Sequence, residues 1–279
     1  MNRETLYESF EIVYQKLDEC PKQGHKHLFF ELVYILSGRG KQCINNNKFD
    51  YRAGHMFLIT PEDCHSFEIE STTEFFFLRF GNVYIRSKDF RTDDVQRMEY
   101  ILQNASHQPG CILKNLSDKV FVKSLIEAMI AEHLNRDLYN KELITKMVDT
   151  MIVVIARNIA KYMPAAVKGD AEEKTLALLN YIQANIYHPE KLRAEKLSKQ
   201  FGISENYFGK YFKKHTDETL PQYIANLRIK LIEARLRFSN MRINEIAYEL
   251  GFTDESHLNK FFKSQRGLSL KAFRSAVAS

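Results

Sequence analysis

Three histidines and one glutamate in the N-terminal third could bring metal-binding or hydrogen-bonding groups together. His25, His27 and Glu31 occur within seven residues of one another, and His65 follows later. Imidazole nitrogens and a carboxylate oxygen suit Zn, Fe or Mn, and they also hydrogen-bond polar small molecules. Three interpretations stay open: a metal site, a polar effector pocket, and a structural cluster of hydrogen-bonded side chains.

Two sets of side chains near the C-terminus combine amide, hydroxyl and lysine groups at helical spacing. They are Asn206, Gly209, Lys210 and Lys213 in the first set, and Ser256, Asn259, Lys260 and Lys263 in the second. Amides and hydroxyls hydrogen-bond base edges, and lysines neutralise phosphates, so such a face suits the major groove of DNA. A single lysine stripe is more often solvated surface, but the duplication favours DNA binding.

These two sets lie in one unit that is written twice between Leu192 and Arg274. The first copy contains LSKQFGIS from Leu197, and the second contains IAYELGFT from Ile246. The glycines Gly202 and Gly251 are 49 residues apart, and the aromatic stripes that follow them are 50 apart. A repeat at fixed spacing predicts two copies of the same local structure.

Each copy is typical of a helix-turn-helix, at about residues 192–215 and 244–266. The glycine closes a short helix, and Ser204 or Thr253 with Asp254 offers N-cap oxygens for the next helix. The predicted buried faces are Tyr207, Phe208, Tyr211 and Phe212 in the first copy, and His257, Leu258, Phe261 and Phe262 in the second. A long helix over 221–238 joins the copies and spans roughly 27 Å, against ~34 Å for one turn of DNA.

This region resembles the C-terminal DNA-binding domain of AraC/XylS-type transcription regulators. The most specific run is EIAYELGFTDESHLNKFFK, from Glu245 to Lys263, followed by Gly267, Ser269 and Phe273. The resemblance implies that Asn206, Gly209 and Lys210 face bases in the first copy, and Glu255, Ser256, Asn259 and Lys260 in the second. Leu270 stands where the family has proline, and Asp217 where the first unit has glycine.

Residues 1–90 read as β-structure and resemble a cupin-like barrel. A first strand is expected around Phe10 to Leu17, turns at 37–40 and 61–63, a hairpin tip at 45–47, and a strand over 75–80. The spacing from His25 to Gly38 reproduces the first cupin motif, whereas Thr60, Glu62 and Ile69 depart from the second. In one strand, alternation would place His25, His27 and Glu31 on the same face.

The residues that we expect around an effector are His25, His27, Glu31, Tyr34, His65 and Arg79, with Phe75 and Phe77 as walls or, more simply, as core. The resemblance implies a small-molecule effector, such as a sugar or another polar metabolite, bound without a metal or cofactor. A metal-dependent cupin enzyme fused to a DNA-tethering helical domain is the alternative.

Residues 91–163 change to a helical period. Helices are expected over 93–102, 117–138 and 141–163, the second with Val120, Phe121, Leu125 and Ala128 on its apolar side. The third carries a wide stripe of Val148, Ile152, Ile155 and Ile159. This helix packs on its own barrel, or part of its stripe meets a second subunit, and the resemblance favours a homodimer. Residues 164–170 are the expected linker, followed by the DNA-binding domain, 171–279.

Charge and cysteine content agree with this division. Residues 171–279 contain 18 Lys and Arg against 12 Asp and Glu, while residues 1–170 contain 22 against 23. The positive excess therefore lies where phosphates would be met. Four separated cysteines, no apolar leader and no long apolar run favour a reduced, cytoplasmic protein that does not enter a membrane.

The sequence therefore predicts an α+β multidomain protein. An N-terminal cupin-like β-barrel is followed by helices and by an all-α domain with two helix-turn-helix units. The expected function is sequence-specific DNA-binding transcription regulation, as an activator, with double-stranded DNA, a small-molecule effector and RNA polymerase as partners. No catalytic or metal-binding role is assigned.

Overall fold

The computed structural model describes residues 3–4, 6–21, 24–45, 47–61, 63–87, 92–103, 105, 110–161 and 173–278. The chain divides into two compact units, Met1–Met163 and Pro164–Ser279. The expected linker at 164–170 and the expected boundary at residue 90 lie outside the described residues. None of the described helices combines the length and apolar character needed to cross a membrane.

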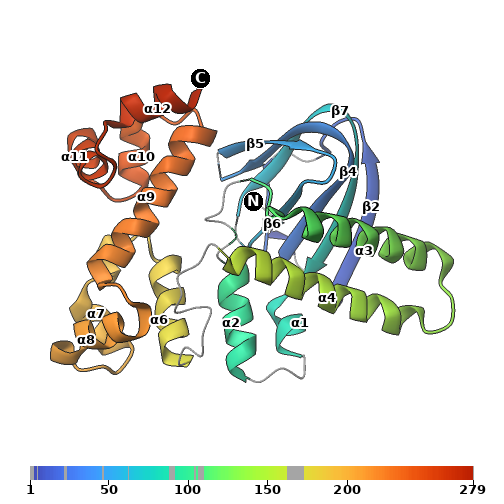
Figure 1. The fold of residues 1–279 in the computed structure, drawn as a ribbon, viewed down its shortest axis with the longest axis horizontal. Coiled ribbons are helices and arrows are strands. Elements are labelled where there is room, and N and C mark those ends of the chain that lie inside the picture. Colours follow the sequence, from blue (N-terminus) through green and yellow to red (C-terminus); the bar gives the residue numbers. More distant parts are fainter. Residues whose placement is uncertain are drawn as a thin grey trace. The chain divides into compact units, whose positions relative to one another are not determined.

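The first unit is built on an antiparallel sheet (Figure 1). Its strand order is β2 (Phe10–Leu17), β7 (His65–Phe80), β4 (Phe30–Ile44) and β5 (Asn47–Arg52), and β6 (Met56–Ile59) also pairs with β4. Two short strands, β1 (Arg3–Glu4) and β3 (Lys26–His27), form a separate parallel pair. The expected first strand and the hairpin at Asn45 are therefore present.

The turn expected at 37–40 is wrong, because β4 runs through these residues. The β4–β7 pairing shifts register between Ile35 and Gly40, so the segment is a bulge within one long strand. Gly38 has φ +91°, and a Cβ there would lie 2.4 Å from the Thr73 Oγ1 atom. The glycines that signalled a turn therefore allow β7 to pass close to a bent strand.

The register of the sheet separates two faces. Glu31 lies opposite Arg79 on β7 and Ile59 on β6, whereas Tyr34 lies opposite Phe76 and Met56. Successive side chains point to opposite faces, so Glu31 and Tyr34 are on different sides of the sheet. The inner face carries Glu31 and Arg79 together with Phe75 and Phe77, and both of these phenylalanines are buried, as expected for core.

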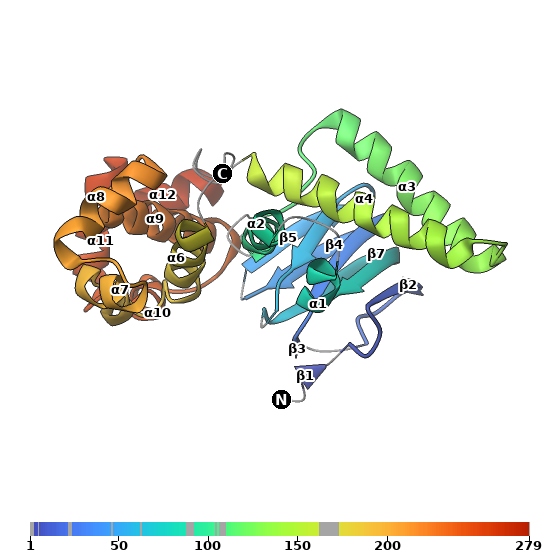
Figure 2. The same cartoon turned by 90° about the horizontal axis from the view of Figure 1, so that it is seen from below.

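Helices cover the other face, as Figures 1 and 2 show from two directions. They are α1 (Asn82–Arg86), α2 (Thr92–Gln103), α3 (Leu116–Asn135) and α4 (Asn140–Ala160). The Tyr84 hydroxyl of α1 donates to Asp149 of α4 at 2.8 Å, and its ring packs edge-on against Phe10 of β2. This contact fixes α1 between the sheet and α4.

The apolar stripe of α4 is buried within its own unit. Val148 and Ile155 are fully buried, and Ile152 and Ile159 are at most 5% exposed. Burying an isoleucine side chain contributes about 2 kcal/mol to stability. The stripe therefore packs on the protein's own core, and the alternative that it meets a second subunit is wrong for these four residues.

The predicted apolar side of α3 is also wrong. Val120 and Phe121 are exposed, whereas Val122, Ile126 and Met129 are buried. The orientation of α3 is set in part by Asp118, a buried carboxylate at its first turn. Asp118 accepts hydrogen bonds from Arg157, from Asn158 at 2.9 Å and from Lys161 at 3.2 Å, all on or directly after α4.

The second unit is helical throughout its described secondary structure. It contains α6 (Glu173–Ala184), a short 3-10 turn (Pro189–Lys191), α7 (Ala194–Gln200), α8 (Glu205–Thr216), α9 (Leu220–Phe238), α10 (Ile243–Glu249), α11 (Glu255–Arg266) and α12 (Leu270–Ala278). Leu176, Leu179 and Ile182 of α6 are fully buried, as is Ile186 just after the helix. The Thr175 and Tyr211 hydroxyls lie 3.0 Å apart and join α6 to α8.

Candidate nucleic-acid interface and buried histidine cluster

The two repeated glycines stand at equivalent corners. Gly202 follows α7 with φ +59°, and Gly251 follows α10 with φ +72°. Both values lie in the left-handed region, which glycine enters without steric cost. After each corner comes a twelve-residue helix, α8 or α11. The repeat read from the sequence is therefore two copies of one helix-turn-helix.

The N-caps of the two second helices differ. The Asp254 carboxylate accepts from the His257 backbone N–H at 2.7 Å, as expected. Ser204 occupies the corresponding N-cap of α8 but makes no side-chain capping bond, so that expectation is wrong. Thr253 instead lies 2.8 Å from the His257 ring nitrogen Nδ1, which holds this ring outside the core.

The buried faces of α8 and α11 are narrower than predicted. Phe208, Tyr211 and Phe212 are buried in α8, and Leu258 and Phe262 in α11. Tyr207 is 47% exposed, and His257 is also exposed, so both were wrongly assigned to the core. Tyr207 and His257 are the first residues of the predicted apolar faces of α8 and α11. Each lies at the edge of its face, where solvent reaches the side chain.

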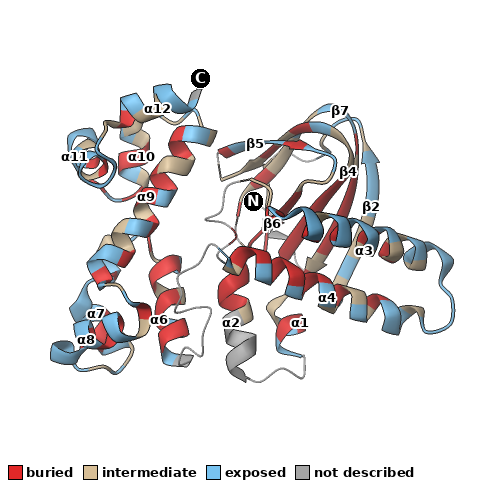
Figure 3. Ribbon diagram, in the orientation of Figure 1, coloured by how far each residue is buried: buried red, intermediate tan, exposed pale blue. Residues whose placement is uncertain are grey.

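The opposite faces are open to solvent. The exposed residues there are Asn206, Gly209, Lys210 and Lys213 on α8, and Glu255, Ser256, Lys260 and Lys263 on α11. Figure 3 shows exposed residues along both helices. Asn259 is only partly exposed, because its Oδ1 atom accepts the Leu270 backbone N–H at 3.1 Å. This bond engages the amide oxygen, and no hydrogen bond from the Asn259 NH₂ group occurs among the described residues.

The helix α9 holds the two helix-turn-helix motifs together. Arg235 on α9 makes a two-pronged ion pair with Glu249 on α10, at 2.8 and 2.6 Å. Arg266 at the end of α11 pairs with Glu233, also on α9. At the first helix-turn-helix, the ring of Phe212 on α8 meets the ring of Tyr223 on α9 edge-on. Figures 1 and 2 show α8 and α11 toward opposite ends of α9 and on the same side of it.

In the first unit of the chain, three predicted polar residues converge on the inner face of the sheet. His27, Glu31 and His65 are each at most 2% exposed, and they offer ligand atoms within 4.8 Å of one another. The His65 Nε2 atom lies 3.0 Å from the Glu31 Oε2 atom, and the His27 Nε2 atom lies 4.0 Å from it. The His25 ring is 4.2 Å from the His65 ring.

Arg79 completes the cluster. Its Nε atom donates to Glu31 Oε1 at 2.7 Å, and its Nη1 atom pairs with Glu11 on β2 at 2.9 Å. Glu11 was not among the predicted residues. It is the second residue of β2, its side chain is 45% exposed, and no signal in the sequence singled it out. The guanidinium also lies over the rings of Phe29 and Phe77, at 5.9 and 5.8 Å.

The cluster shifts the pKa values of His27 and Glu31 to values well below their ordinary ones. Burial lowers the pKa of His27 to about 4, because it outweighs the opposing charge of Glu31. Burial acts to raise the pKa of Glu31, but the hydrogen bond from His65 and the charges of His65 and Arg79 hold it at about 2. Near neutral pH the cluster therefore contains an ionised glutamate beside a neutral His27.

His27 is left without a hydrogen bond of ordinary geometry. Both of its ring nitrogens are buried and unpaired among the described side chains, and the ring stacks on Phe29 at 4.2 Å. A buried polar group without a partner costs about 1–3 kcal/mol. The donor set of two imidazoles and the Glu31 carboxylate is one that a transition metal could accept, and a ligand hydroxyl could satisfy it equally well.

Two details of the sequence prediction for this cluster are corrected. Residues 25–31 do not form one strand, because β3 ends at His27 and β4 begins at Phe30. Their convergence comes from the fold, through a bridge between His25 and His65. Tyr34 faces the helices, where burial and the nearby Glu127 of α3 raise its pKa, so it does not belong to the cluster.

Comparisons with known proteins agree on both halves of the chain. Residues 197–276 match a helix-turn-helix domain family, and residues 13–91 match the AraC-like ligand-binding domain family. The chain is similar to the transcriptional activator RhaS of Mannheimia succiniciproducens, with 25% identity over 90% of this chain and 88% of the relative. The activator RhaR of Cronobacter sakazakii is also 25% identical, over 90% and 86% of the two chains.

Further similar proteins include the Msm operon regulatory protein of Streptococcus mutans, with 24% identity over 89% of this chain and 84% of the relative. Among solved structures, the DNA-binding domain of AdpA in complex with a target DNA is 21% identical. It covers 38% of this chain and 93% of its own, with a TM-score of 0.35. The curated relatives named here are regulators, which does not support the cupin enzyme alternative.

Proposed function

The chain belongs to the AraC-type family of transcription regulators, with a helix-turn-helix domain and a ligand-binding domain, and on that premise we propose that α8 and α11 read successive major grooves of one duplex. The observation that carries this is the paired helix-turn-helix. Its helices α8 and α11 lie on one side of α9 (Figure 1), and the lysines of both helices are exposed. The nineteen residues of α9 span roughly 28 Å, close to one DNA turn.

The proposed contacts follow from chemistry and exposure. Asn206 and Lys210 of α8, and Glu255, Ser256, Asn259 and Lys260 of α11, contact base edges, while Lys213 and Lys263 contact phosphates. Asn259 presents its NH₂ group, which favours a base with an acceptor such as guanine or thymine. Gly209 has no side chain, so the first helix discriminates less between sequences than the second.

The test uses duplexes selected by the wild-type protein from a randomised pool. We expect binding that falls steeply with salt, because lysines release counterions from the phosphates. Lys260→Ala should weaken binding to the selected site by about 1–3 kcal/mol and relax the preference at one base pair. Lys230→Ala, which removes an exposed lysine of α9, is the matched control and should leave that preference unchanged.

Two outcomes would count against DNA reading by α11. One is binding that is insensitive to salt and selects no sequence. The other is a Lys260→Ala protein that selects the same site as the wild type with equal discrimination at every position. Equal weakening of all sequences would reassign Lys260 to a phosphate.

The buried cluster supports an effector site in the sheet unit. We propose that a sugar or another polar metabolite contacts His25, His27, Glu31, His65 and Arg79, because His27 lacks a hydrogen-bonding partner that a ligand hydroxyl would supply. Binding shifts the regulator between arrangements only by its differential affinity for them. A panel of polar metabolites tests this by thermal shift. A shift that persists unchanged in Glu31→Gln would place the ligand elsewhere.

Two further partners are proposed for a transcription regulator, namely a second copy of this chain and RNA polymerase. We propose a homodimer, supported by the exposed apolar residues of α3 and the loop after it, which include Val120, Phe121 and Leu134. We also propose that the protein acts as an activator through RNA polymerase, as befits relatives named as activators. A chromosomal regulator works where the bacterial chromosome is, which favours the cytoplasm.

A further inference from the structure

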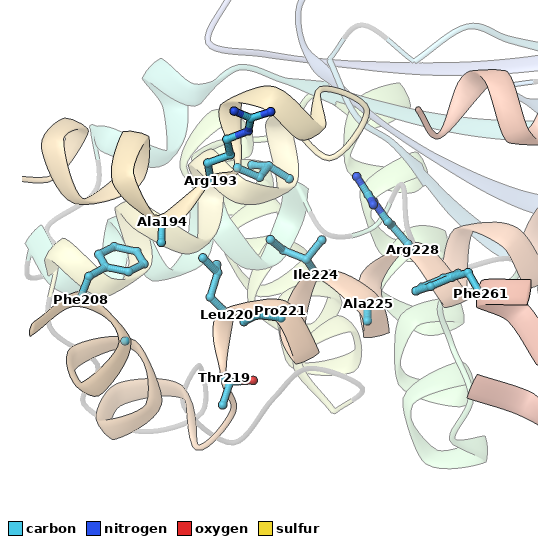
Figure 4. Close-up of a pocket in the computed structure, with 12 residues that line it drawn as sticks. Arg193, Ala194, Phe208, Thr219, Leu220, Pro221, Ile224, Ala225, Arg228 and Phe261 are labelled. Carbon is cyan, nitrogen blue, oxygen red and sulfur yellow. The ribbon is translucent and has the colours of Figure 1, made fainter. Parts of the chain in front are cut away.

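The helical unit contains a groove between its two helix-turn-helix motifs. The groove has a volume of about 670 Å³ and is lined by residues from α7, α8, α9 and α11, among them Gly209, Ile224, Arg228 and Phe261. Figure 4 shows Arg193 and Arg228 reaching it from different elements, with Ile224 between them. The lining is apolar apart from these two cations and Thr219.

One face of α9 forms the floor. Pro221, Ile224, Ala225 and Arg228 follow each other at helical spacing, and all are exposed or partly exposed. On the opposite side of the helix, Tyr223 and Leu227 are buried against the protein. The connecting helix thus keeps an open face between the two recognition helices.

Arg228 is a cation without a counter-charge in the described part of the chain. Its Nε atom is buried and has no hydrogen-bond partner, and its guanidinium lies 5.5 Å from the Phe252 ring. Burial lowers its pKa, with no carboxylate to oppose the effect. A half-buried guanidinium with unused donors is the group that phosphate oxygens satisfy best.

Gly209 gives independent support. It lies inside α8, where glycine is less favourable than alanine. Its φ is not positive, and a Cβ built on it meets nothing within 4 Å. No contact within the chain therefore requires glycine there, and the empty space borders the groove. Glycine suits a place where another backbone approaches the helix closely.

The geometry of B-DNA identifies the occupant. Two successive major grooves on one side of a duplex are separated by a minor groove and its two sugar-phosphate strands. In a complex of this kind, the groove between α8 and α11 faces those two sugar-phosphate strands. We propose that this groove receives the sugar-phosphate backbone bordering the central minor groove, with Arg228 on a phosphate and Ile224 and Ala225 against deoxyribose carbons. This inference rests on the proposed function.

The proposal has a consequence for sequence preference. A·T-rich minor grooves are narrow and carry an enhanced negative potential that attracts arginine. Arg228 then makes affinity depend on base pairs that no side chain of α8 or α11 touches. Arg193, exposed at the start of α7, supplies a second cation at the rim of the groove.

The experiment measures binding of the full chain to a mixed-sequence 40-base-pair duplex and to sites selected by the wild type. Arg228→Gln should lower affinity for both roughly tenfold, the size of one charged hydrogen bond, and should reduce the salt slope by about 0.9. Lys230→Ala removes one charge from the same helix outside the groove and should change neither. Replacing central A·T pairs by G·C should weaken the wild type more than Arg228→Gln.

A second variant guards against loss of folding, because Arg228 also packs on Phe252. Ala225→Glu places a carboxylate in the groove and should repel the phosphates, whereas Gln222→Glu makes the same change of charge on α9 outside it. Equal DNA binding by Ala225→Glu and Gln222→Glu would overturn the proposal, as would an unchanged salt slope in folded Arg228→Gln. A wild type that binds neither duplex would instead overturn the proposed function itself.

Discussion

Asp217 and Gly267 occupy the same position in the two repeats, directly after the recognition helices. Both adopt left-handed backbone, with φ +60° at Asp217 and +75° at Gly267. An aspartate pays a steric cost there that glycine avoids, and its negative charge is also unfavourable at a helix C-terminus. The departure from the family's glycine is therefore a local weakness in the first motif.

Asp217→Gly should stabilise the helical unit by about 0.5–1 kcal/mol. The matched variant Gly267→Ala should destabilise it by about 1 kcal/mol, since alanine there would be forced into the left-handed region. Thermal and urea unfolding of the two variants beside the wild type measures both. A lower stability for Asp217→Gly would mean that the aspartate side chain has a stabilising role that the described contacts do not contain.

At the same scale, periodicity predicted the outward residues well and the edges of faces poorly. The lysines of α8 and α11 are exposed because a 3.6-residue period fixes the side opposite a strong aromatic stripe. Tyr207 and His257 begin those stripes and remain outside the core. Tyr34 was misplaced although strand parity already separates it from Glu31, since residues three apart in a strand face opposite ways.

Among the elements, α3 shows why a sequence cannot always choose between two apolar sides. Val120 and Phe121 offer one side, and Val122, Ile126 and Met129 offer another. Periodicity alone does not decide, because both sides repeat at helical spacing. The choice depends on Asp118, whose partners lie about forty residues away at the end of α4. That pairing is a tertiary fact, as is the meeting of His27, Glu31 and His65.

The side of α3 left outside is the surface that we expect a second subunit to cover. Val120→Glu should convert the proposed homodimer to monomer, because association would bury an unpaired charge. Val83→Glu on α1 is the matched control, since Val83 is 80% exposed and apolar but lies on another element. Sedimentation velocity measures both. A monomeric wild type at micromolar concentration, or a dimeric Val120→Glu, would contradict the predicted interface.

On the scale of the whole molecule, the sequence predicted two differently built units because strand-like and helical periods occupy different stretches of the chain. Each unit has its own buried core, from Phe30 and Phe76 in the sheet unit to Phe212 and Phe262 in the helical unit. A change confined to one core should therefore act on the unfolding of that unit. For a change in the buried histidine cluster, the effect on the unfolding free energy of the sheet unit should depend on pH.

His27 should make the sheet unit less stable in mild acid. Its pKa is about 4 in the folded protein against 6.5 ordinarily, so the unfolded chain binds more protons between these values. Stability therefore falls as the pH drops from 6.5 to 4, by at most about 3 kcal/mol. Glu31, with its pKa lowered to about 2, adds a further loss between pH 4.5 and 2.

His27→Gln isolates this contribution, because glutamine keeps a polar side chain but does not titrate. We expect its unfolding free energy to change less than that of the wild type between pH 6.5 and 4, with the difference approaching one proton. His188→Gln is the control, because His188 lies in the helical unit and its replacement should leave the unfolding of the sheet unit unchanged. Urea unfolding at half-unit pH steps, followed by scanning calorimetry, resolves the two units. Parallel curves for wild type and His27→Gln would show that folding does not lower the pKa of His27, and the neutral His27 described above would then be wrong.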